Sequence, residues 1–455
     1  MKLRNINRVH FIGIGGIGMS ALARFFLFND KEVSGYDKVA TNLTKELEKE
    51  GALISYVDEI DLSLNDETID LVVYTPAIPK DSKQFQFFIK SAIKMVKRAE
   101  LLGQITKDFF TIAVAGTHGK TTTSSIIAHV LEESNHGGVA FLGGIASNYS
   151  SNVILNAKNN VAVVEADEFD KSFLQLYSDV IVLTSMDPDH LDIYGNQEAL
   201  IDNFIAFTNT LKDKNSLIVH ENISSYFQNP KTYGESDSNN LQLVNVSIKH
   251  GAYHFDVLYK QHLIKDFVLN YPGRHNLTNA AAAILVAIEM GVSETAIKNS
   301  ISSFKGVKRR FEIHVQNKHH IYVDDYAHHP KEVEALVSSV REFYPKMEIT
   351  GIFQPHLFSR TKDFMKEFCE SLSKLDHLIL MDIYPAREKP IKGINSTVLL
   401  ENTNCKTKRI LRKGESLSNM LKLENDQVIL TIGAGDIDLE VPKLKKYVAN
   451  YSKND

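Results

Sequence analysis

A stretch near residue 111 constrains the fold of this chain more than any other feature. The sequence TIAVAGTHGKTTTSS, residues 111–125, places an apolar segment before a glycine-rich turn and a run of threonines and serines after it. A strand, a tight glycine turn and a helix in this order form the repeating step of α/β folds with a parallel sheet. We therefore expect a parallel sheet with a ligand site where this strand ends.

The same alternation of apolar strands and helical patterns recurs along all 455 residues. The predicted strands are 8–14, 31–37, 69–78, 109–116, 160–170, 179–192, 321–330, 348–360, 377–386 and 427–437. A chain of this length exceeds one hydrophobic core, and about three domains are expected. We predict an α/β protein with an N-terminal Rossmann-like parallel sheet in residues 1–107, a central P-loop-type ATPase sheet in 108–306, and a C-terminal Rossmann-like domain in 307–455.

Composition excludes several classes of protein. The net charge of -5 predicts no nucleic-acid partner. The two cysteines, Cys369 and Cys405, are too few and too far apart for a disulfide framework or a cysteine zinc site. The longest apolar stretch, residues 280–292, is shorter than the roughly 18 residues that a membrane span needs. We expect a cytoplasmic protein without membrane insertion.

The first glycine-rich turn matches the dinucleotide fingerprint. Gly13, Gly15 and Gly18 follow a predicted strand and precede a predicted helix, and Asp37 comes 19 residues later. Such a turn lets the backbone approach a pyrophosphate at the helix N-terminus, and the acid binds a ribose hydroxyl. NAD and a UDP-sugar both carry a pyrophosphate, so the pattern does not choose between them. A turn that only packs the helix on the strand is the structural alternative.

The second turn differs from a Walker A loop. Counting back from Gly119 places Val114 where the first Walker A glycine belongs, so the loop is shorter. Lys120 lies where it can reach terminal phosphates, and Thr121 offers a hydroxyl to Mg²⁺. A capped helix start is the alternative, but a lysine between glycine and threonine directly after an apolar strand favours phosphate binding.

Two strand ends flank this loop if their strands neighbour the strand of residues 109–116. Glu165 follows the apolar run VAVV, and His190 follows VLTSMDPD. A carboxylate and an imidazole there could hold Mg²⁺ ions that neutralise a triphosphate. A solvated acidic loop is the alternative for the first segment, and turn-forming aspartates are the alternative for the second.

Later segments carry further polar candidates. His275, Asn276 and Asn279 occur at a predicted helix start, where they either cap the helix or contact an adenine edge. Arg309, Arg310 and Arg360 are candidate anion clamps, because guanidinium groups pair bidentately with carboxylates and phosphates. The segment DDYAHHP, residues 324–330, is either ligand-facing or a charged turn.

Together these segments resemble the Mur ligase family. The shared motifs, in chain order, are HFIGIGGIGMSALA, VAGTHGKTTT, EADEFD, DHLDIYG, GRHNLTNAAAA, GVKRRFE, VDDYAHHP, FQPHLFSRT, YPAREKPI and GAGDI. They cover essentially the whole chain, and many motifs in one order are more specific than any one of them. The shortened second loop is this family's form of ATP site.

The resemblance implies ATP-dependent joining of L-alanine to UDP-N-acetylmuramate through an acyl phosphate, with Mg²⁺ as two ions. It implies a UDP-sugar site at Gly13, Gly15, Gly16, Gly18 and Asp37. It implies an ATP site at Gly116, Thr117, His118, Gly119, Lys120, Thr121, Thr122, His275, Asn276, Asn279, Arg310 and Asp325. It implies metal ligands Thr121, Glu165 and His190, and amino-acid contacts Tyr326, His328 and Arg360. The implied catalytic residues are Lys120, Glu165, His190 and Arg360.

Three other functions fit part of the sequence. A nicotinamide-dependent oxidoreductase would bind its dinucleotide at the turn that begins at Gly13, with Asp37. This function would not explain the second glycine-rich turn with Lys120, which we call the lysine loop. A binding protein without activity would not need Lys120 beside two metal-binding side chains. A ligase of the same architecture, such as a folate polyglutamate synthase or a ligase for recycled peptides, is the nearest alternative. One departure from the family is Leu357, where many relatives have arginine.

Overall fold

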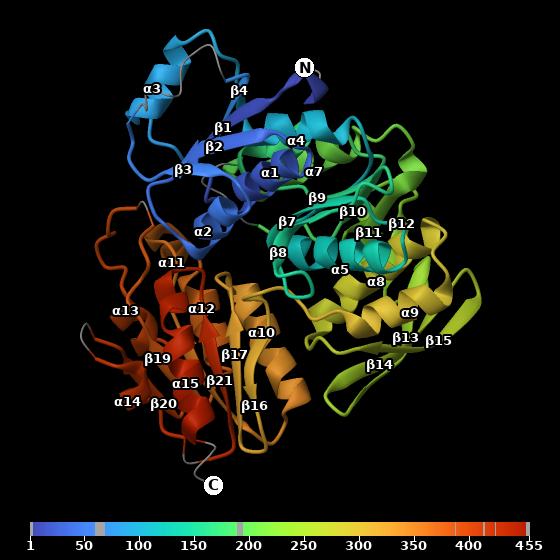
Figure 1. The fold of residues 1–455 in the computed structure, drawn as a ribbon. Helices are drawn as coiled ribbons and strands as arrows, with labels where there is room; N and C mark the ends of the chain where they lie inside the picture. The colour runs from blue at the N-terminus through green and yellow to red at the C-terminus, as the bar shows by residue number, and fades with distance from the viewer. Residues whose placement is uncertain are drawn as a thin grey trace. The chain divides into compact units, whose positions relative to one another are not determined.

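The computed structural model describes residues 3–59, 69–188, 194–386, 388–412, 415–423 and 425–451. Three sheets of five, ten and six strands follow one another along the described chain (Figure 1). The α/β class predicted from the sequence is confirmed. Among the described helices, none is both long enough and apolar enough to cross a membrane.

The first sheet is parallel throughout and has the strand order β3-β2-β1-β4-β5. Its strands are β1 (Arg8–Ile12), β2 (Glu32–Tyr36), β3 (Leu53–Ser55), β4 (Leu71–Tyr74) and β5 (Met95–Lys97). Its helices are α1 (Ile17–Phe28), α2 (Asn42–Lys49), α3 (Lys83–Lys90) and α4 (Arg98–Thr106). From β1 the strand order runs through β2 to β3 on one side of the sheet, and through β4 to β5 on the other. The glycine turn after β1 therefore lies at the switch point where ligands bind in such sheets.

The short strands β3 and β5 were not predicted. Each has three residues, and only Val96 among them is buried. Strands this short at the edges of a sheet leave no apolar run or alternation in the sequence from which to recognise them.

The second sheet has the order β15-β14-β13-β12-β11-β10-β6-β9-β7-β8. The strands are β6 (Phe110–Ala115), β7 (Val139–Ala146), β8 (Ser151–Leu155), β9 (Val161–Glu165), β10 (Val180–Leu183), β11 (Leu217–His220), β12 (Lys231–Gly234), β13 (Leu241–Lys249), β14 (Ala252–Tyr259) and β15 (His262–Leu269). The α-helices are α5 (Lys120–Glu133), α7 (Gln197–Thr208), α8 (Arg274–Glu289) and α9 (Glu294–Ser303). Strand β6 pairs in parallel with β9 on one side and β10 on the other, which confirms the predicted neighbours of the lysine loop.

The first sheet and the strands around β6 share one hydrophobic core, so they belong to one compact unit. A buried amide joins them at the start of α1. Asn152 on β8 donates to the carbonyl of Ile17 at 2.5 Å and to the hydroxyl of Ser20, and it accepts from Arg24 at 2.5 Å. The helix that follows the first glycine turn is therefore fixed to the sheet that carries the second.

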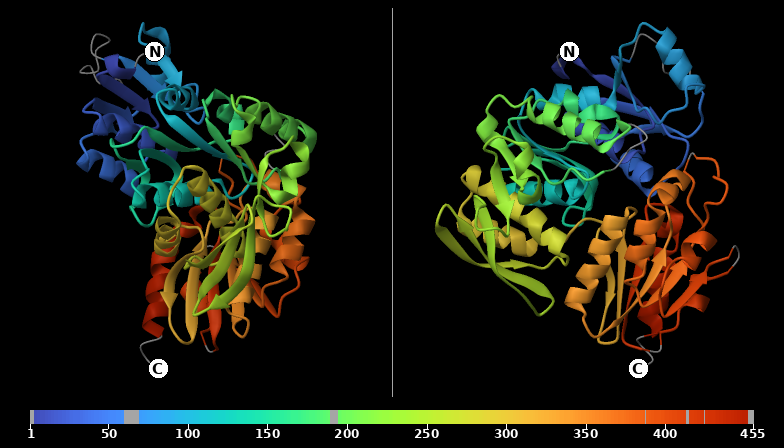
Figure 2. Two further views of the ribbon diagram at one scale, coloured as in Figure 1. Left: turned by 90° about the vertical axis from the view of Figure 1, so that its right-hand side faces the viewer. Right: turned by 180° about the vertical axis from the view of Figure 1, so that it is seen from behind.

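The third sheet has the order β16-β17-β21-β18-β19-β20, in which only β16 is antiparallel among the pairs described. The strands are β16 (Glu312–Gln316), β17 (His320–Asp325), β18 (Glu348–Phe353), β19 (His377–Leu380), β20 (Thr407–Ile410) and β21 (Gln427–Ile432). The helices are α10 (Pro330–Phe343), α11 (Phe358–Asp363), α12 (Met365–Leu372), α13 (Ser396–Glu401), α14 (Leu417–Met420) and α15 (Val441–Tyr451). Helices cover both faces of this sheet, with α15 on one face and α10 and α12 on the other (Figure 2).

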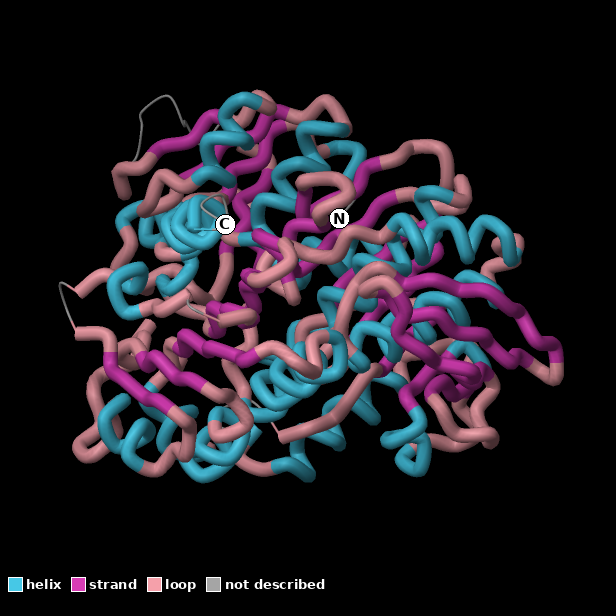
Figure 3. The backbone as a smooth tube through the Cα atoms, turned by 90° about the horizontal axis from the view of Figure 1, so that it is seen from below, coloured by secondary structure: helices cyan, strands magenta, loops and turns pink. Residues whose placement is uncertain are grey.

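The chain divides into two compact units. One unit comprises Met1–Val246, Phe255–Val268 and Thr278–Lys305, and the other comprises Ser247–His254, Leu269–Leu277 and Gly306–Asp455. Figure 3 shows the helices, strands and loops along the described backbone. The boundaries predicted at residues 107 and 306 stay predictions.

Candidate functional site

The lysine loop is held by the end of the neighbouring strand β10. The hydroxyl of Ser185 accepts from the backbone N–H of His118 at 2.9 Å and lies 2.9 Å from the hydroxyl of Thr117. The single hydroxyl hydrogen of Thr184 is shared between the carbonyls of Ala115 and His118, whose oxygens lie 3.1 and 2.5 Å from the hydroxyl oxygen. These contacts fix the loop of residues 116–119 before any ligand arrives, which is the preorganisation that a phosphate site needs.

Both predicted glycines of the loop are required by its shape. Gly116 has a φ of +132°, and a Cβ there would lie 2.2 Å from the hydroxyl of Thr184 and 2.8 Å from the backbone nitrogen of Ser185. Gly119 has a φ of +82° and immediately precedes α5, whose free N–H groups favour an anion. A Cβ on Gly119 would lie 2.8 Å from the amide oxygen of Asn279, so that predicted residue adjoins the loop.

Lys120 lies in the first turn of α5 and forms a buried ion pair. Its Nζ lies 2.8 and 2.9 Å from the two carboxylate oxygens of Glu168, and it donates to the carbonyl of Gly116 at 2.7 Å. Burial alone lowers the pKa of Lys120, but the carboxylates of Glu168, Asp167 and Glu165 outweigh burial, and the net shift is upward. The lysine therefore stays protonated at neutral pH.

The acidic loop after β9 supplies the carboxylates beside the lysine. Glu165 accepts from the backbone N–H of Gly143 at 3.0 Å, and Asp167 lies 3.6 Å from the guanidinium of Arg98. Thr121 is buried in the first turn of α5. The predicted metal ligands Thr121 and Glu165 are described, whereas His190 lies outside the described residues.

A cavity of about 380 Å³ joins this acidic loop to the first glycine turn. Its walls include Gly16 and Gly18 at the start of α1, Arg98 at the start of α4, and the carboxylates Glu165 and Asp167. A molecule in the cavity therefore contacts the turn expected to bind a pyrophosphate and the acidic loop whose Glu168 pairs with Lys120. The two predicted nucleotide-type sites are close to each other in this unit.

In the first glycine turn, the acid supports the backbone. The carboxylate of Asp37 accepts from the N–H of Gly15 at 2.8 Å and from that of Val39 at 3.2 Å. A Cβ on Gly15 would lie 2.8 Å from the same carboxylate, and a Cβ on Gly18 would lie 2.7 Å from the guanidinium of Arg98. Gly15 and Gly18 thus have no room for a Cβ, because the side chains of Asp37 and Arg98 fill that space.

At the start of α8 the predicted residues have different surroundings. Asn276 is buried, and its amide donates to the carbonyl of Pro272 at 2.6 Å. The ring of His275 lies against Gly273, where a Cβ would be 2.7 Å from it. These two residues belong to the second unit, whereas Asn279 belongs to the first.

The second unit gathers its predicted residues where β17 ends. Asp325 is buried and accepts from the N–H groups of Phe311 and Ala327, both at 2.7 Å. Its burial raises the pKa to about 6, although Arg310 opposes the shift. The guanidinium of Arg310 lies 5.2 Å from the centre of the Tyr326 ring, close enough for a cation–π contact.

Two histidines and Arg360 complete this cluster. The rings of His328 and His356 are 5.9 Å apart, and Arg360 Nη1 lies 3.5 Å from His356 Nδ1. Burial lowers the pKa of both histidines to about 4, so both rings are neutral at pH 7. Leu357, between His356 and Arg360, has a φ of +70°, which is strained for a residue with a side chain and is typical of functional sites.

Profiles of known families match most of the chain. The Mur ligase catalytic domain matches residues 8–110, the Mur ligase middle domain matches 114–287, and the Mur ligase glutamate ligase domain matches 309–435. A UDP-N-acetylmuramate–L-alanine ligase of Flavobacterium psychrophilum is 49% identical over 98% of this chain and 99% of its own length. The chain belongs to the Mur ligase family. The protein of that name from Christiangramia forsetii is 46% identical to this Mur ligase over 98% of both chains.

Solved structures agree with this assignment. The UDP-N-acetylmuramate–alanine ligase of Thermotoga maritima matches this Mur ligase with a TM-score of 0.80 and 25% identity, over 98% of this chain and all of the other. A murein peptide ligase of Psychrobacter arcticus matches with a TM-score of 0.69 over 98% and 99% of the two chains. At 20% identity, the second match shows a shared fold only.

Sequence reasoning missed four residues of these clusters. Ser185 and Thr184 hold the lysine loop, Glu168 pairs with Lys120, and Arg98 lines the cavity. The segments containing the first three were singled out, but nothing in them distinguishes the side chains that face the loop. Arg309, expected as an anion clamp, instead pairs with Asp324 at 3.2 Å.

Proposed function

We propose that this Mur ligase joins L-alanine to the lactyl carboxylate of UDP-N-acetylmuramate and releases ADP and phosphate. The names of the full-length relatives support this choice of substrates. The observation in the structure that supports it best is the cavity that the first glycine turn shares with Glu165 and Asp167. A sugar nucleotide held at the turn directs its sugar toward the acidic loop beside Lys120.

The first step transfers the γ-phosphoryl group of ATP. One oxygen of the lactyl carboxylate attacks the γ-phosphorus, the bond to the bridging oxygen breaks, and ADP leaves. Lys120 and the N–H groups of the loop at Gly116 and Gly119 hold the phosphate oxygens in line, and this positioning provides most of the catalysis. Phosphate groups replace Glu168 as the partner of Lys120 in this step.

The second step forms the amide bond. The amine of L-alanine attacks the carbonyl carbon of the acyl phosphate, phosphate leaves with the electrons of the broken C–O bond, and the amine loses a proton. Arg360 pairs with the carboxylate of the amino acid. The departing phosphate takes that proton, and His328 Nε2 accepts a hydrogen bond from the amine, because His328 Nδ1 lies 3.0 Å from the carbonyl of Tyr326 and therefore carries the ring hydrogen.

The residues beside the loop fit magnesium. Thr121 offers a hydroxyl oxygen and Glu165 a carboxylate, which are donors that Mg²⁺ prefers. Bound Mg²⁺ neutralises the charge of the phosphates and of the transferred group. The assignment of His190 and of a second ion rests on resemblance to the family.

Phosphate release tests the proposal. Purified protein receives Mg-ATP and UDP-N-acetylmuramate, and then L-alanine, glycine, L-serine or a peptide in separate reactions. We expect release that requires both the sugar nucleotide and L-alanine. Release that requires a peptide instead of a free amino acid would assign the chain to another member of the family, and binding of both nucleotides without any release would contradict a ligase.

A further inference from the structure

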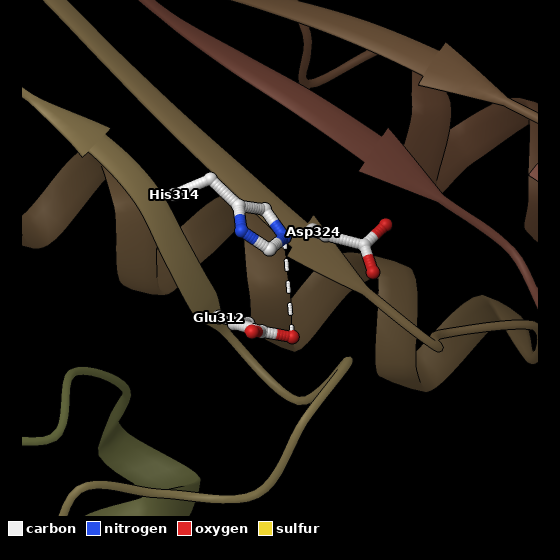
Figure 4. A group of neighbouring side chains, drawn as sticks. All are labelled: Glu312, His314 and Asp324. Atoms are coloured by element: carbon white, nitrogen blue, oxygen red, sulfur yellow. Dashed lines mark ion pairs between the residues drawn. The ribbon is translucent and has the colours of Figure 1, made fainter. Parts of the chain in front are cut away.

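Outside this site, three metal-binding side chains converge at the edge of the third sheet. Glu312 and His314 lie on β16, and Asp324 lies on the adjacent strand β17 (Figure 4). One donor atom from each residue lies within 4.8 Å of the other two. Within the described part of the chain, no other three histidine, cysteine or acidic side chains are so arranged.

An irregularity in the strand pairing directs His314 toward the two acids. Glu312 pairs with Asp324 in the antiparallel ladder, and the register shifts between Ile313 and Val315. His314 is the extra residue of this β-bulge, which has no counterpart on β17. Bulges of this kind redirect a side chain and are frequent beside functional sites.

The imidazole of His314 has an unsatisfied nitrogen. Its Nε2 is buried and has no hydrogen-bond partner, and it lies 3.9 Å from a carboxylate oxygen of Glu312. A buried nitrogen without a partner is costly, and a cation bound between it and the two carboxylates would satisfy it.

Other groups orient both carboxylates. The backbone N–H of Arg309 donates to Glu312 at 2.8 Å, and its guanidinium Nε donates to Asp324 at 3.2 Å. The hydroxyl of Thr431 donates to the other oxygen of Asp324 at 2.6 Å. Hydrogen bonds of this type hold the ligands of metal sites in place.

We propose that Glu312, His314 and Asp324 bind one divalent first-row transition metal ion, and that Zn²⁺ fits this donor set best. One imidazole and two carboxylates are typical zinc ligands, whereas Mg²⁺ and Ca²⁺ prefer oxygen alone. Zinc bonds of about 2.0–2.2 Å require the donors to approach by roughly half an ångström.

The metal would stabilise the segments that carry the amino-acid site. Asp324 directly precedes Asp325, and the N–H of Tyr326 donates to the carbonyl of Arg309 at 2.6 Å. Arg309 in turn donates its N–H to Glu312. Metal binding therefore fixes the strand ends that position Tyr326 and the neighbouring Arg310.

Cobalt binding tests the site on the full-length protein. Co²⁺ is added to metal-free protein in excess Mg²⁺, which occupies sites made of oxygen ligands, and visible absorption is recorded. We expect one equivalent of Co²⁺ to give the intense bands of a low-coordinate site, and Zn²⁺ to displace it. His314→Gln and Glu312→Gln should weaken binding at least about tenfold, as loss of a metal's supporting residues does.

His319→Gln is the matched control, because His319 lies 2.7 Å from Asp426 and, among the described residues, belongs to no group of three such side chains. Its cobalt spectrum should equal that of the unmodified protein. Absence of bands in the folded protein, or bands that persist unchanged in both His314→Gln and Glu312→Gln, would overturn the proposal. A zinc-dependent increase in melting temperature that His314→Gln removes would support it independently of absorption.

Discussion

The lysine loop of the first unit holds a charged side chain, whereas the cluster after β17 in the second unit holds neutral histidines. Three carboxylates raise the pKa of Lys120 despite its burial, so the first site keeps a positive charge. In the second site, burial lowers the pKa of His328 and His356 to about 4 and raises that of Asp325 to about 6. Both sites follow the carboxyl ends of parallel strands, so the difference comes from side-chain partners and not from the fold.

This difference matches two kinds of chemistry. A permanent charge with preformed N–H donors suits a polyanion such as the triphosphate of ATP. Neutral imidazoles beside one guanidinium suit a small amino acid, which carries a single carboxylate. The comparison predicts that substitutions in the first site impair the use of ATP, whereas those in the second impair the use of the amino acid.

The largest effect is expected from Lys120→Met. Methionine keeps most of the length of the side chain but removes the charge that binds phosphate, and loss of such a group costs about a hundredfold or more in kcat/KM. Phosphate release at varied ATP concentration measures the loss. Lys107→Met is the control, since among the described residues Lys107 pairs with the face of Tyr177 and the side chain of Gln104, away from the loop. Equal effects of the two substitutions would refute a phosphate role for Lys120.

The next largest effect concerns the stability of the lysine loop. Gly116→Ala adds a Cβ in a left-handed conformation and against the backbone of Ser185, and we expect a loss of about 2–3 kcal/mol in the free energy of unfolding. Gly16→Ala in the first turn meets no atom nearer than 3.5 Å and should cost less than about 1 kcal/mol. Urea denaturation compares them, and a Gly116→Ala protein as stable as the unmodified one would contradict the loop geometry.

A smaller effect is expected from Arg360→Lys in the second unit. Lysine retains the charge but cannot form the two parallel hydrogen bonds of a guanidinium with a carboxylate. The KM for L-alanine should increase roughly tenfold, while the KM for ATP stays unchanged. Lys362→Met on the same helix, α11, is the control. An equal change in both KM values would indicate a general distortion of the protein.

The smallest effect is a change in the pH dependence of stability. Because the folded pKa of His328 is about 4, below its ordinary value of 6.5, the ring stabilises the fold above pH 6.5. That stabilisation is lost as the pH falls from 6.5 toward 4. His328→Gln should therefore reduce the acid-dependent loss by about 1 kcal/mol over this range. Thermal unfolding at several pH values measures it, and an unchanged slope would mean that the histidine is not neutralised by burial.

The carboxyl group of Asp325 changes the stability of the fold in the opposite direction to His328 within the same pH range. Its folded pKa of about 6 lies above the ordinary 3.8, so its contribution is present below pH 3.8 and is lost as the pH rises through 6. The contributions of His328 and Asp325 to the pH dependence of stability therefore partly cancel in the unmodified protein. Asp325→Asn should therefore make the acid-dependent loss of stability steeper, whereas His328→Gln makes it shallower.

Local features were predictable from the sequence, and partners distant along the chain were not. Gly116 and Lys120 were predictable because a phosphate loop is contiguous and its glycines meet a requirement of the backbone. Ser185 supports that loop from just after β10, 67 residues beyond His118, and spacing carries no signal for such a pairing. Likewise, the segment EADEFD was recognised as acidic, but only the structure shows that Glu168 is the carboxylate that pairs with Lys120.

The same limit applies to the third sheet. Strands β17, β18, β19 and β21 were predictable because they are buried and apolar. The bulge that directs His314 toward Asp324 leaves no trace in the sequence, because the extra residue is defined only by the register with β17. Resemblance to a family supplied the residue roles that spacing could not.

Transfer of an oxygen isotope tests the central claim most directly. UDP-N-acetylmuramate labelled with ¹⁸O in the lactyl carboxylate is incubated with the protein, Mg-ATP and L-alanine, and the released phosphate is analysed by mass spectrometry. Activation through an acyl phosphate predicts that each released phosphate carries one oxygen from the carboxylate. Phosphate that forms together with the amide but contains no ¹⁸O would contradict that mechanism.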